Sequence, residues 1–134
     1  MTGVIAQLEA ATHRVVDHLS TELRALGLTP GEVNALAHLR AEQPLAVAEL
    51  QGVTGQRPST LTGVIDRLER RGLARRAVNA RDRRSFVLEL TPEGAEAART
   101  VEAAFAAVEA RASLQERDVA AFHRVLRALE DAAA

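Results

Sequence analysis

Residues 58–91 read PSTLTGVIDRLERRGLARRAVNARDRRSFVLELT, and the patterns in this segment are the most informative about the fold. Apolar residues recur in its first part at intervals of three and four: Leu61, Val64, Ile65 and Leu68. Such spacing predicts a helix with one buried face, beginning at Pro58 and ended by Gly72. The opposite face is small and polar, with Ser59, Thr60, Thr62, Gly63, Asp66, Arg67 and Arg70.

A shorter helix is predicted just upstream, over AVAELQGV at residues 46–53. The residues TGQ then make a turn before Pro58. A short helix, a glycine turn and a second helix with a small polar N-terminal face form a helix-turn-helix candidate.

Downstream of Gly72 the pattern changes to that of a β-hairpin. Residues 73–79 and 84–90 are predicted strands, and residues 80–83 are the turn between them. Phe86, Leu88 and Leu90 alternate with polar or smaller residues, so one face packs against the protein. The arginines gather at the tip.

Helices are predicted on both sides of this stretch. One covers residues 3–26 and ends at Gly27. The next begins at a Thr29–Glu32 capping box and ends before Pro44, and two more follow, one over residues 92–112 and one opened by SLQE at 113–116. The predicted fold class is mainly α with a small β-hairpin wing, an α+β winged helix-turn-helix with helices at both ends.

The first and last helices carry long apolar stripes, which run from Val4 to Leu26 and from Val119 to Leu129. A small central module does not have enough surface to cover both stripes. A second subunit would bury them, so the sequence predicts a homodimer. The alternative is that these helices fold back on their own chain.

Composition narrows the class of protein. The chain has 134 residues and no cysteine, which excludes disulfides and zinc–thiolate sites. No apolar run approaches the ~20 residues of a membrane span, and the N-terminus does not resemble a signal peptide. We therefore expect a cytoplasmic protein with no membrane partner and no cofactor.

Charge is segregated along the chain, although the formal net charge is only -1. Residues 56–85 hold nine arginines and three acidic residues, and the remainder holds eight arginines and fifteen acidic residues. A basic block in an acidic body is typical of a surface that binds a polyanion.

The hairpin tip is the densest part of this block. Arg81, Arg83 and Arg84 could bind phosphate or enter a narrow minor groove, where the potential is most negative. Asp82 lies among them, and we expect it to pair with a neighbouring arginine and hold its guanidinium in place. The alternative is a solvated charged turn, which the adjoining helix-turn-helix disfavours.

Three stretches resemble the MarR family of winged helix-turn-helix regulators. DRRSFVLELTPEG at residues 82–94 is similar to the family's wing signature, which is met by Asp82, Arg84, Leu90, Thr91 and Gly94. STLTGVIDRLERRGLARR at residues 59–76 resembles its recognition helix, and LTPGEVNALAHL at residues 28–39 its second helix. The resemblance covers essentially the whole chain.

The resemblance implies one domain over residues 1–134, with a DNA-binding lobe at 28–91 and dimerisation helices at 1–27 and 92–134. It also implies a homodimer that represses transcription from a pseudo-palindromic double-stranded DNA operator. The fourth helix would enter the major groove and the wing the flanking minor groove. The expected DNA-binding residues are Arg57, Ser59, Thr60, Thr62, Gly63, Arg67, Arg81, Asp82, Arg83 and Arg84.

Three positions depart from the family's pattern. Gly63 stands where many relatives have a long basic side chain. Gln56 stands where an apolar residue is usual, and Arg57 where a small capping residue is usual. Base readout is therefore expected to rely on Arg57 and the hydroxyl side chains.

Many members of the family bind a small aromatic or lipophilic effector between the dimer helices and the DNA-binding lobe. The resemblance implies a site lined by the first, second and fifth helices, with candidates His13, Arg14, His18, His38 and Phe105. The alternative is that these are surface or interface residues. His13 and His18 lie ~140° apart around a helix and form no metal pair, and His38 with Glu42 is only a two-ligand pair, so no metal site is predicted.

Enzymatic function is not predicted. The sequence has no nucleophile–base arrangement, no glycine-rich phosphate loop and no carboxylate pair in a plausible cleft. The remaining alternative is a winged-helix module that binds a protein partner without sequence-specific DNA binding. A steep dependence of binding on salt would distinguish DNA from such a partner.

Overall fold

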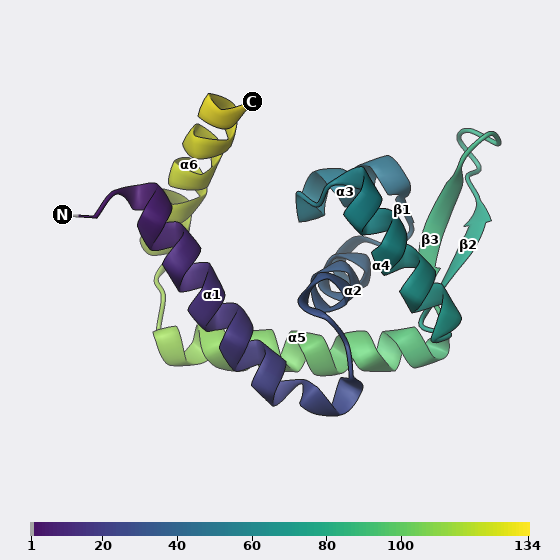
Figure 1. Cartoon of the computed structure of the whole chain (residues 1–134), viewed down its shortest axis with the longest axis horizontal. Helices are drawn as coiled ribbons and strands as arrows, with labels where there is room; N and C mark the ends of the chain where they lie inside the picture. The colour runs from purple at the N-terminus through teal and green to yellow at the C-terminus, as the bar shows by residue number, and fades with distance from the viewer. Residues whose placement is uncertain (1) are drawn as a thin grey trace. The chain divides into compact units, whose positions relative to one another are not determined.

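The computed structural model of the chain describes residues 2–134 (Figure 1). It has a predominantly helical fold with one small antiparallel sheet, which confirms the predicted fold class. The elements are α1 (Val4–Glu22), a 3₁₀ turn η1 (Arg24–Leu26), α2 (Pro30–Glu42), β1 (Leu45–Ala46), α3 (Val47–Thr54), α4 (Pro58–Arg70), β2 (Ala74–Val78), β3 (Phe86–Leu90), α5 (Pro92–Ala112) and α6 (Glu116–Ala133).

The chain divides into two compact units, Met1–Ala104 and Phe105–Ala134, with the boundary inside α5. The first unit contains the helix-turn-helix of α3 and α4 and the wing of β2 and β3. In the second unit, no described residue of α6 is buried. None of the helices in residues 2–134 is both long enough and apolar enough to span a membrane.

The core of the first unit lies among α2, α3, α4 and the sheet. Its fully buried large side chains come from all of these elements and from α5: Leu36, Leu39, Leu50, Leu61, Val64, Leu68, Leu88 and Val101. The predicted apolar face of α4 is confirmed, since Leu61, Val64, Ile65 and Leu68 are its buried residues.

Two glycines set the turns around α4. Gly55, after α3, and Gly72, after α4, have φ values of 68° and 71°. In this left-handed region a Cβ is unfavourable, so glycine is preferred there. Gly55 lets the chain turn from α3 into α4, and Gly72 lets it leave α4 for the wing.

The sheet has three strands in the order β1–β3–β2, whereas the sequence predicted only the hairpin. The missing strand is β1, which pairs Leu45 with Leu88 in antiparallel register. Two residues are too few to show an alternating pattern, so β1 forms only because packing brings it to β3. Both hairpin strands are shorter than predicted, and the loop at residues 79–85 is longer, because side chains within this loop bond to its backbone.

The first helix is also shorter than predicted. The α-helix ends at Glu22, and the chain tightens into η1 before Gly27, whose φ is 64°. Leu23, at the junction, is 5% exposed, so the change of helix type turns this side chain into the core. The capping box that opens α2 is confirmed: Glu32 N–H donates to Thr29 Oγ1, and Thr29 N–H donates to the Glu32 carboxylate.

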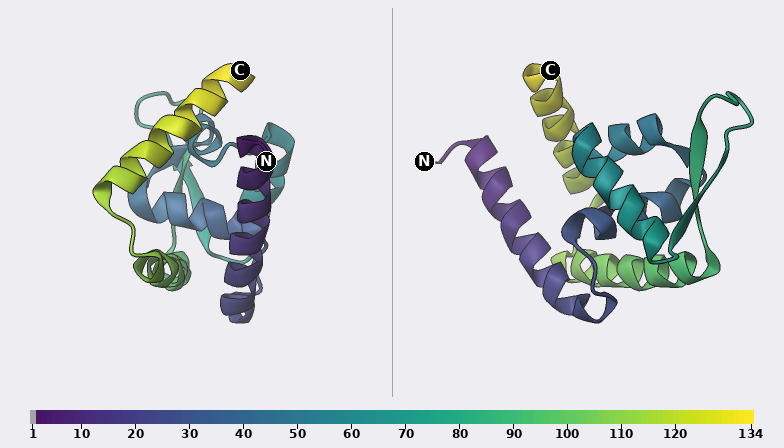
Figure 2. Two further views of the ribbon diagram at one scale, coloured as in Figure 1. Left: turned by 90° about the vertical axis from the view of Figure 1, so that its left-hand side faces the viewer. Right: turned by 45° about the vertical axis from the view of Figure 1, so that its right-hand side comes forward.

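The first part of α5 runs below α2 and begins at the base of the hairpin (Figure 1 and the right-hand view of Figure 2). Ala97, Ala98 and Val101 are its buried apolar contacts with the lobe. Arg40 on α2 donates to Glu102 at 2.8 Å. These contacts place the start of α5, and with it the end of β3, firmly on the lobe.

Candidate nucleic-acid interface

The open face of α4 carries hydroxyl groups near its N-terminus. Ser59, Thr60 and Thr62 are all exposed, as the sequence predicted. They are not equivalent, because the Thr62 hydroxyl donates to the Pro58 carbonyl at 2.9 Å, whereas the Ser59 and Thr60 hydroxyls have no partner within residues 2–134. Ser59 and Thr60 therefore offer both donor and acceptor to a ligand.

Arg57 occupies the N-cap position of α4 with an extended backbone. Its side chain does not cap the helix and is exposed. A positive side chain at a helix N-terminus is unfavourable toward the helix dipole, which leaves its guanidinium better placed on an anion in front of the helix.

The wing tip is a hydrogen-bonded loop rather than a loose turn. Asn79 Oδ1 accepts from Arg81 N–H at 3.0 Å, and Asp82 Oδ1 accepts from Arg84 N–H at 3.1 Å. The Ser85 hydroxyl bonds to both the Asn79 amide and the Asp82 carbonyl. The loop therefore fixes the directions in which its arginines leave the backbone.

Asp82 also contacts the side chain of Arg84, with 3.3 Å between Oδ1 and Nε. This is the pairing expected from the sequence. The Arg84 side chain is nevertheless 94% exposed, so its terminal nitrogens point into solvent and remain available to an anion. Asn79 was not among the predicted site residues. The signal for it was local: Asn79 and Ser85 bracket the predicted turn, and both are residues that bond to backbone in turns.

The base of the wing uses its arginines within the protein. Arg76 on β2 donates to Glu69 at 2.6 Å and to Asp66 at 3.0 Å, and its guanidinium carbon lies 4.4 Å from the centre of the Phe86 ring. Arg75 pairs with Glu89 on the neighbouring strand. Arg76 therefore ties the hairpin to α4, and Arg75 ties the two strands of the hairpin to each other.

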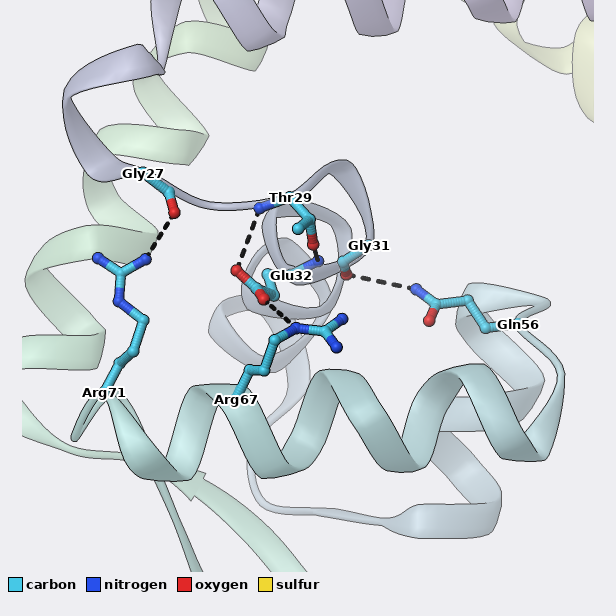
Figure 3. Close-up of polar contacts among 7 residues, drawn as sticks. All are labelled: Gly27, Thr29, Gly31, Glu32, Gln56, Arg67 and Arg71. Atoms are coloured by element: carbon cyan, nitrogen blue, oxygen red, sulfur yellow. Dashed lines mark hydrogen bonds and ion pairs between the residues drawn. The ribbon is translucent and has the colours of Figure 1, made fainter.

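A second set of polar contacts joins α4 to α2 and to the turn before it (Figure 3). Arg67 Nε donates to the buried carboxylate of Glu32 at 2.6 Å. Arg71 donates to the carbonyls of Leu26 and Gly27. Near the start of α4, the Gln56 amide donates to the Gly31 carbonyl at 3.3 Å, a contact that an apolar residue at this position could not make.

The nine arginines of the basic block thus fall into two groups. Five make contacts inside the protein: Arg67, Arg71, Arg75, Arg76 and Arg84. Within residues 2–134, the other four side chains have no hydrogen bond or ion pair: Arg57, Arg70, Arg81 and Arg83. The free arginines lie at the two ends of α4 and in the wing loop, so their positive charge is not neutralised within the described part of the chain.

Arg67 and Gly63 lie differently from the rest of the predicted DNA-binding set. Both are half-buried, whereas the other eight are exposed. Arg67 turns from the open face of α4 toward α2, where Glu32 holds it. The role of Glu32 was predicted only as a helix cap, and no local pattern indicates a partner 35 residues away.

The candidate effector residues lie on three different helices. His13, Arg14 and His18 are exposed on α1, and His38 is half-buried on α2. Phe105, on α5, belongs to the second unit. In the part of the chain that the structure describes, no three His, Asp or Glu side chains gather closely enough to hold a metal ion.

Comparison with known proteins agrees with this architecture. Residues 26–85 match the MarR family profile. The HTH-type transcriptional repressor MdtR of Bacillus subtilis is 32% identical over 94 residues, which are 70% of this chain and 61% of MdtR.

Solved structures align over nearly the whole chain. A probable transcriptional regulator from Pseudomonas aeruginosa superposes with a TM-score of 0.75 at 26% identity, covering 94% of this chain and 96% of that one. S. aureus MepR, in its DNA-binding conformation, has a TM-score of 0.87 at 19% identity, covering 99% and 100%. At that identity the second likeness concerns the fold alone.

Proposed function

The chain belongs to the MarR family of winged-helix regulators, and from this membership we propose that it is a DNA-binding transcriptional regulator. It acts as a homodimer on a pseudo-palindromic double-stranded operator, and its action is repression, as the name of MdtR states for that relative. In each subunit α4 reads the major groove and the wing enters the adjacent minor groove.

The distribution of free arginines carries this proposal. A protein that used its basic block for internal ion pairs would leave little charge for a ligand. Within the described part of the chain, Arg57, Arg70, Arg81 and Arg83 are unpaired. Arg57 directly precedes the helix that carries the exposed hydroxyls, Arg70 ends it, and Arg81 and Arg83 lie in the wing loop. Free guanidinium groups on the same elements as small hydroxyl side chains suit a duplex, in which phosphates border the base edges of a groove.

The end helices support the homodimer. The α1 helix buries no residue, and Val4, Ile5 and Val15 are exposed on it. The α6 helix likewise exposes Phe122 and Val125. Two copies would remove these apolar surfaces from water, and their two-fold symmetry would match a palindromic site.

A small aromatic or lipophilic effector would release the operator. Within the first unit, the residues proposed to line its site lie on α1 and α2: His13, Arg14, His18 and His38. An imidazole or guanidinium near apolar helix faces would suit a ligand with an acidic group on an apolar body.

The test is selection of binding sites from random duplexes, followed by salt titration on the best site. We expect an inverted repeat and a steep fall of log affinity with log salt. The double variant Arg81→Gln/Arg83→Gln should reduce the slope, whereas Arg24→Gln, an exposed arginine of η1 outside the basic block, should not. No selected sequence, or a shallow slope equal for all three proteins, would favour a protein-binding module instead. Screening small molecules for release of the selected site then tests the effector.

A further inference from the structure

A cluster of three residues joins α4 to α2: Arg67 and Gly63 lie on α4, and Glu32 lies on α2. A simple tie between the two helices does not explain its geometry. Glu32 is 2% exposed, and both of its oxygens are engaged: Oε2 by Thr29 N–H at 3.1 Å and Oε1 by Arg67 Nε at 2.6 Å. A carboxylate fixed in this way cannot rotate to follow its partner. Its position therefore determines the position of the Arg67 guanidinium.

The contact uses only one edge of the guanidinium. Glu32 Oε1 accepts a hydrogen bond from Arg67 Nε. Within residues 2–134, neither Nη1 nor Nη2 of Arg67 makes a hydrogen bond or an ion pair. In Figure 3 these two nitrogens point toward the N-terminal end of α4. The Arg67 side chain is 43% exposed, so a buried carboxylate holds a guanidinium whose free end reaches solvent.

Gly63 lies beneath that free end. Residues 63 and 67 are one turn apart, and side chains lean toward the N-terminus of a helix, so Arg67 covers the surface of the preceding turn. A Cβ built on Gly63 would lie 3.2 Å from Arg67 Nη1. A side chain at residue 63 would therefore require the Arg67 guanidinium to shift by a few tenths of an ångström or more from its position over α4.

We propose that Glu32 is a positioning residue that holds Arg67 over Gly63, so that the Arg67 fork contacts DNA at the place where a residue-63 side chain would otherwise lie. This inference rests on the proposed function. The ligand chemistry is a pair of acceptors that matches two parallel N–H groups, either phosphate oxygens or the O6/N7 edge of a guanine.

The sharpest test is Gly63→Ala, because a purely structural role of Gly63 and a role in placing Arg67 predict different effects on DNA affinity. Alanine in place of a half-buried glycine inside a helix favours the helical backbone, so the melting temperature should rise. If Gly63 only needs to be small for the fold, DNA affinity stays unchanged. If the added methyl displaces Arg67, affinity for the selected site falls by about tenfold, within the range for removal of one bidentate pair of hydrogen bonds.

The double variant Gly63→Ala/Arg67→Gln is the control for a direct clash between the methyl group and DNA. With Arg67 absent, Gly63→Ala should cause no further loss of affinity relative to Arg67→Gln alone. An equal loss in both backgrounds would overturn the proposal, because the methyl group itself would then meet DNA. The proposal would also be overturned if the Arg67→Gln variant bound DNA as tightly as the parent protein.

Glu32→Gln tests the positioning residue, measured well below its melting temperature. We expect weaker binding with Arg67 present and no added loss in the Arg67→Gln background. A lower melting temperature with unchanged affinity and salt dependence would make Glu32 a structural tie only, and would overturn the proposal.

Two comparisons complete the design. For Arg67→Gln, equal losses on the selected and random duplexes with a smaller salt slope identify a phosphate contact, and a loss confined to the selected duplex identifies a base contact. Both support the proposal. If the parent protein itself selects no duplex, the proposed function is wrong. If the parent binds a selected duplex and the variants bind it with the same affinity, the proposed function stands and only this inference is wrong.

Discussion

Gly94 lies directly against the backbone of Leu73: a Cβ built on Gly94 would be 2.7 Å from the Leu73 carbonyl carbon and would overlap the oxygen. Thr91 closes the same junction. Its hydroxyl donates to the Gly72 carbonyl and accepts from Gly94 N–H, and its own N–H donates to the Leu73 carbonyl. The Leu-Thr-x-x-Gly part of the wing signature thus locks the start of α5 onto the turn between α4 and β2.

Gly94→Ala should therefore destabilise the fold. The new methyl group meets backbone, which cannot move aside without shifting the wing, so we expect a loss of about 3 kcal/mol, at the upper end for overpacking. Chemical denaturation measures the free energy of unfolding. Gly52→Ala in α3 is the matched control, because a Cβ there meets nothing within 4 Å, and it should stabilise the helix by about 0.5–1 kcal/mol. Equal effects of the two substitutions would contradict the close approach.

On α4, the structure separates two threonines that the sequence treats alike. Thr60→Ala should cost about 1–3 kcal/mol on the selected DNA site and less on random DNA, because its hydroxyl has no partner within residues 2–134. Thr62→Ala should cost less on the selected site, since the Thr62 hydroxyl already donates to the Pro58 carbonyl. Competition binding measures both. Equal losses of Thr60→Ala on selected and random DNA would mean that Thr60 positions the protein without reading sequence.

Arg84→Ala in the wing should weaken DNA binding and reduce the salt slope by about one unit for each phosphate that the protein no longer neutralises. Folding should change by no more than ~0.5 kcal/mol, because the side chain is 94% exposed. Salt titration and thermal melting provide the two measurements. An unchanged salt slope would show that Arg84 does not bind a phosphate.

Substitution of Asp82 tests its role by the direction of the change in DNA affinity. Asp82→Ala removes an anion from a DNA-facing surface, yet it should weaken binding because Arg84 loses its fixed backbone and side-chain acceptor. Asp82→Asn retains an oxygen for Arg84 N–H and should bind more tightly than Asp82→Ala. Competition binding on the selected site ranks the two variants. Tighter binding than the parent by both variants would show that Asp82 is no brace and that only the net charge of the wing matters.

Phe122→Glu on α6 should dissociate or aggregate the proposed homodimer, because Phe122 is 52% exposed on the apolar stripe of a helix that buries nothing. Ala120→Glu places the same charge roughly 200° away around the helix and should leave the mass unchanged. Light scattering at micromolar concentration measures the mass of each variant and of the parent protein. A parent protein of monomeric mass with its helices folded would contradict the dimer.

The helices, the cap of α2 and the wing follow from the sequence alone, but the cap of α6 does not: its N-cap is Gln115, whose N–H donates to Asp118, and not the predicted SLQE box at 113–116. The spacing of Leu61, Val64, Ile65 and Leu68 specified the buried face of α4, and Thr29 with Glu32 specified the start of α2. These features depend on residues within a turn or two of one another. Local chemistry therefore decides them, and a pattern in the sequence reveals them.

The use of the arginines and the places of the short elements depend on how the whole chain packs. The β1 strand exists because packing brings Leu45 opposite Leu88, and Arg67 is held because α2 presents a buried carboxylate to it. Arg57, Arg81 and Arg83 remain free because no acidic side chain among residues 2–134 reaches them in the fold. Ion pairs between distant residues depend on which helix faces meet, and that is set by the packing of the whole core rather than by neighbours in the chain.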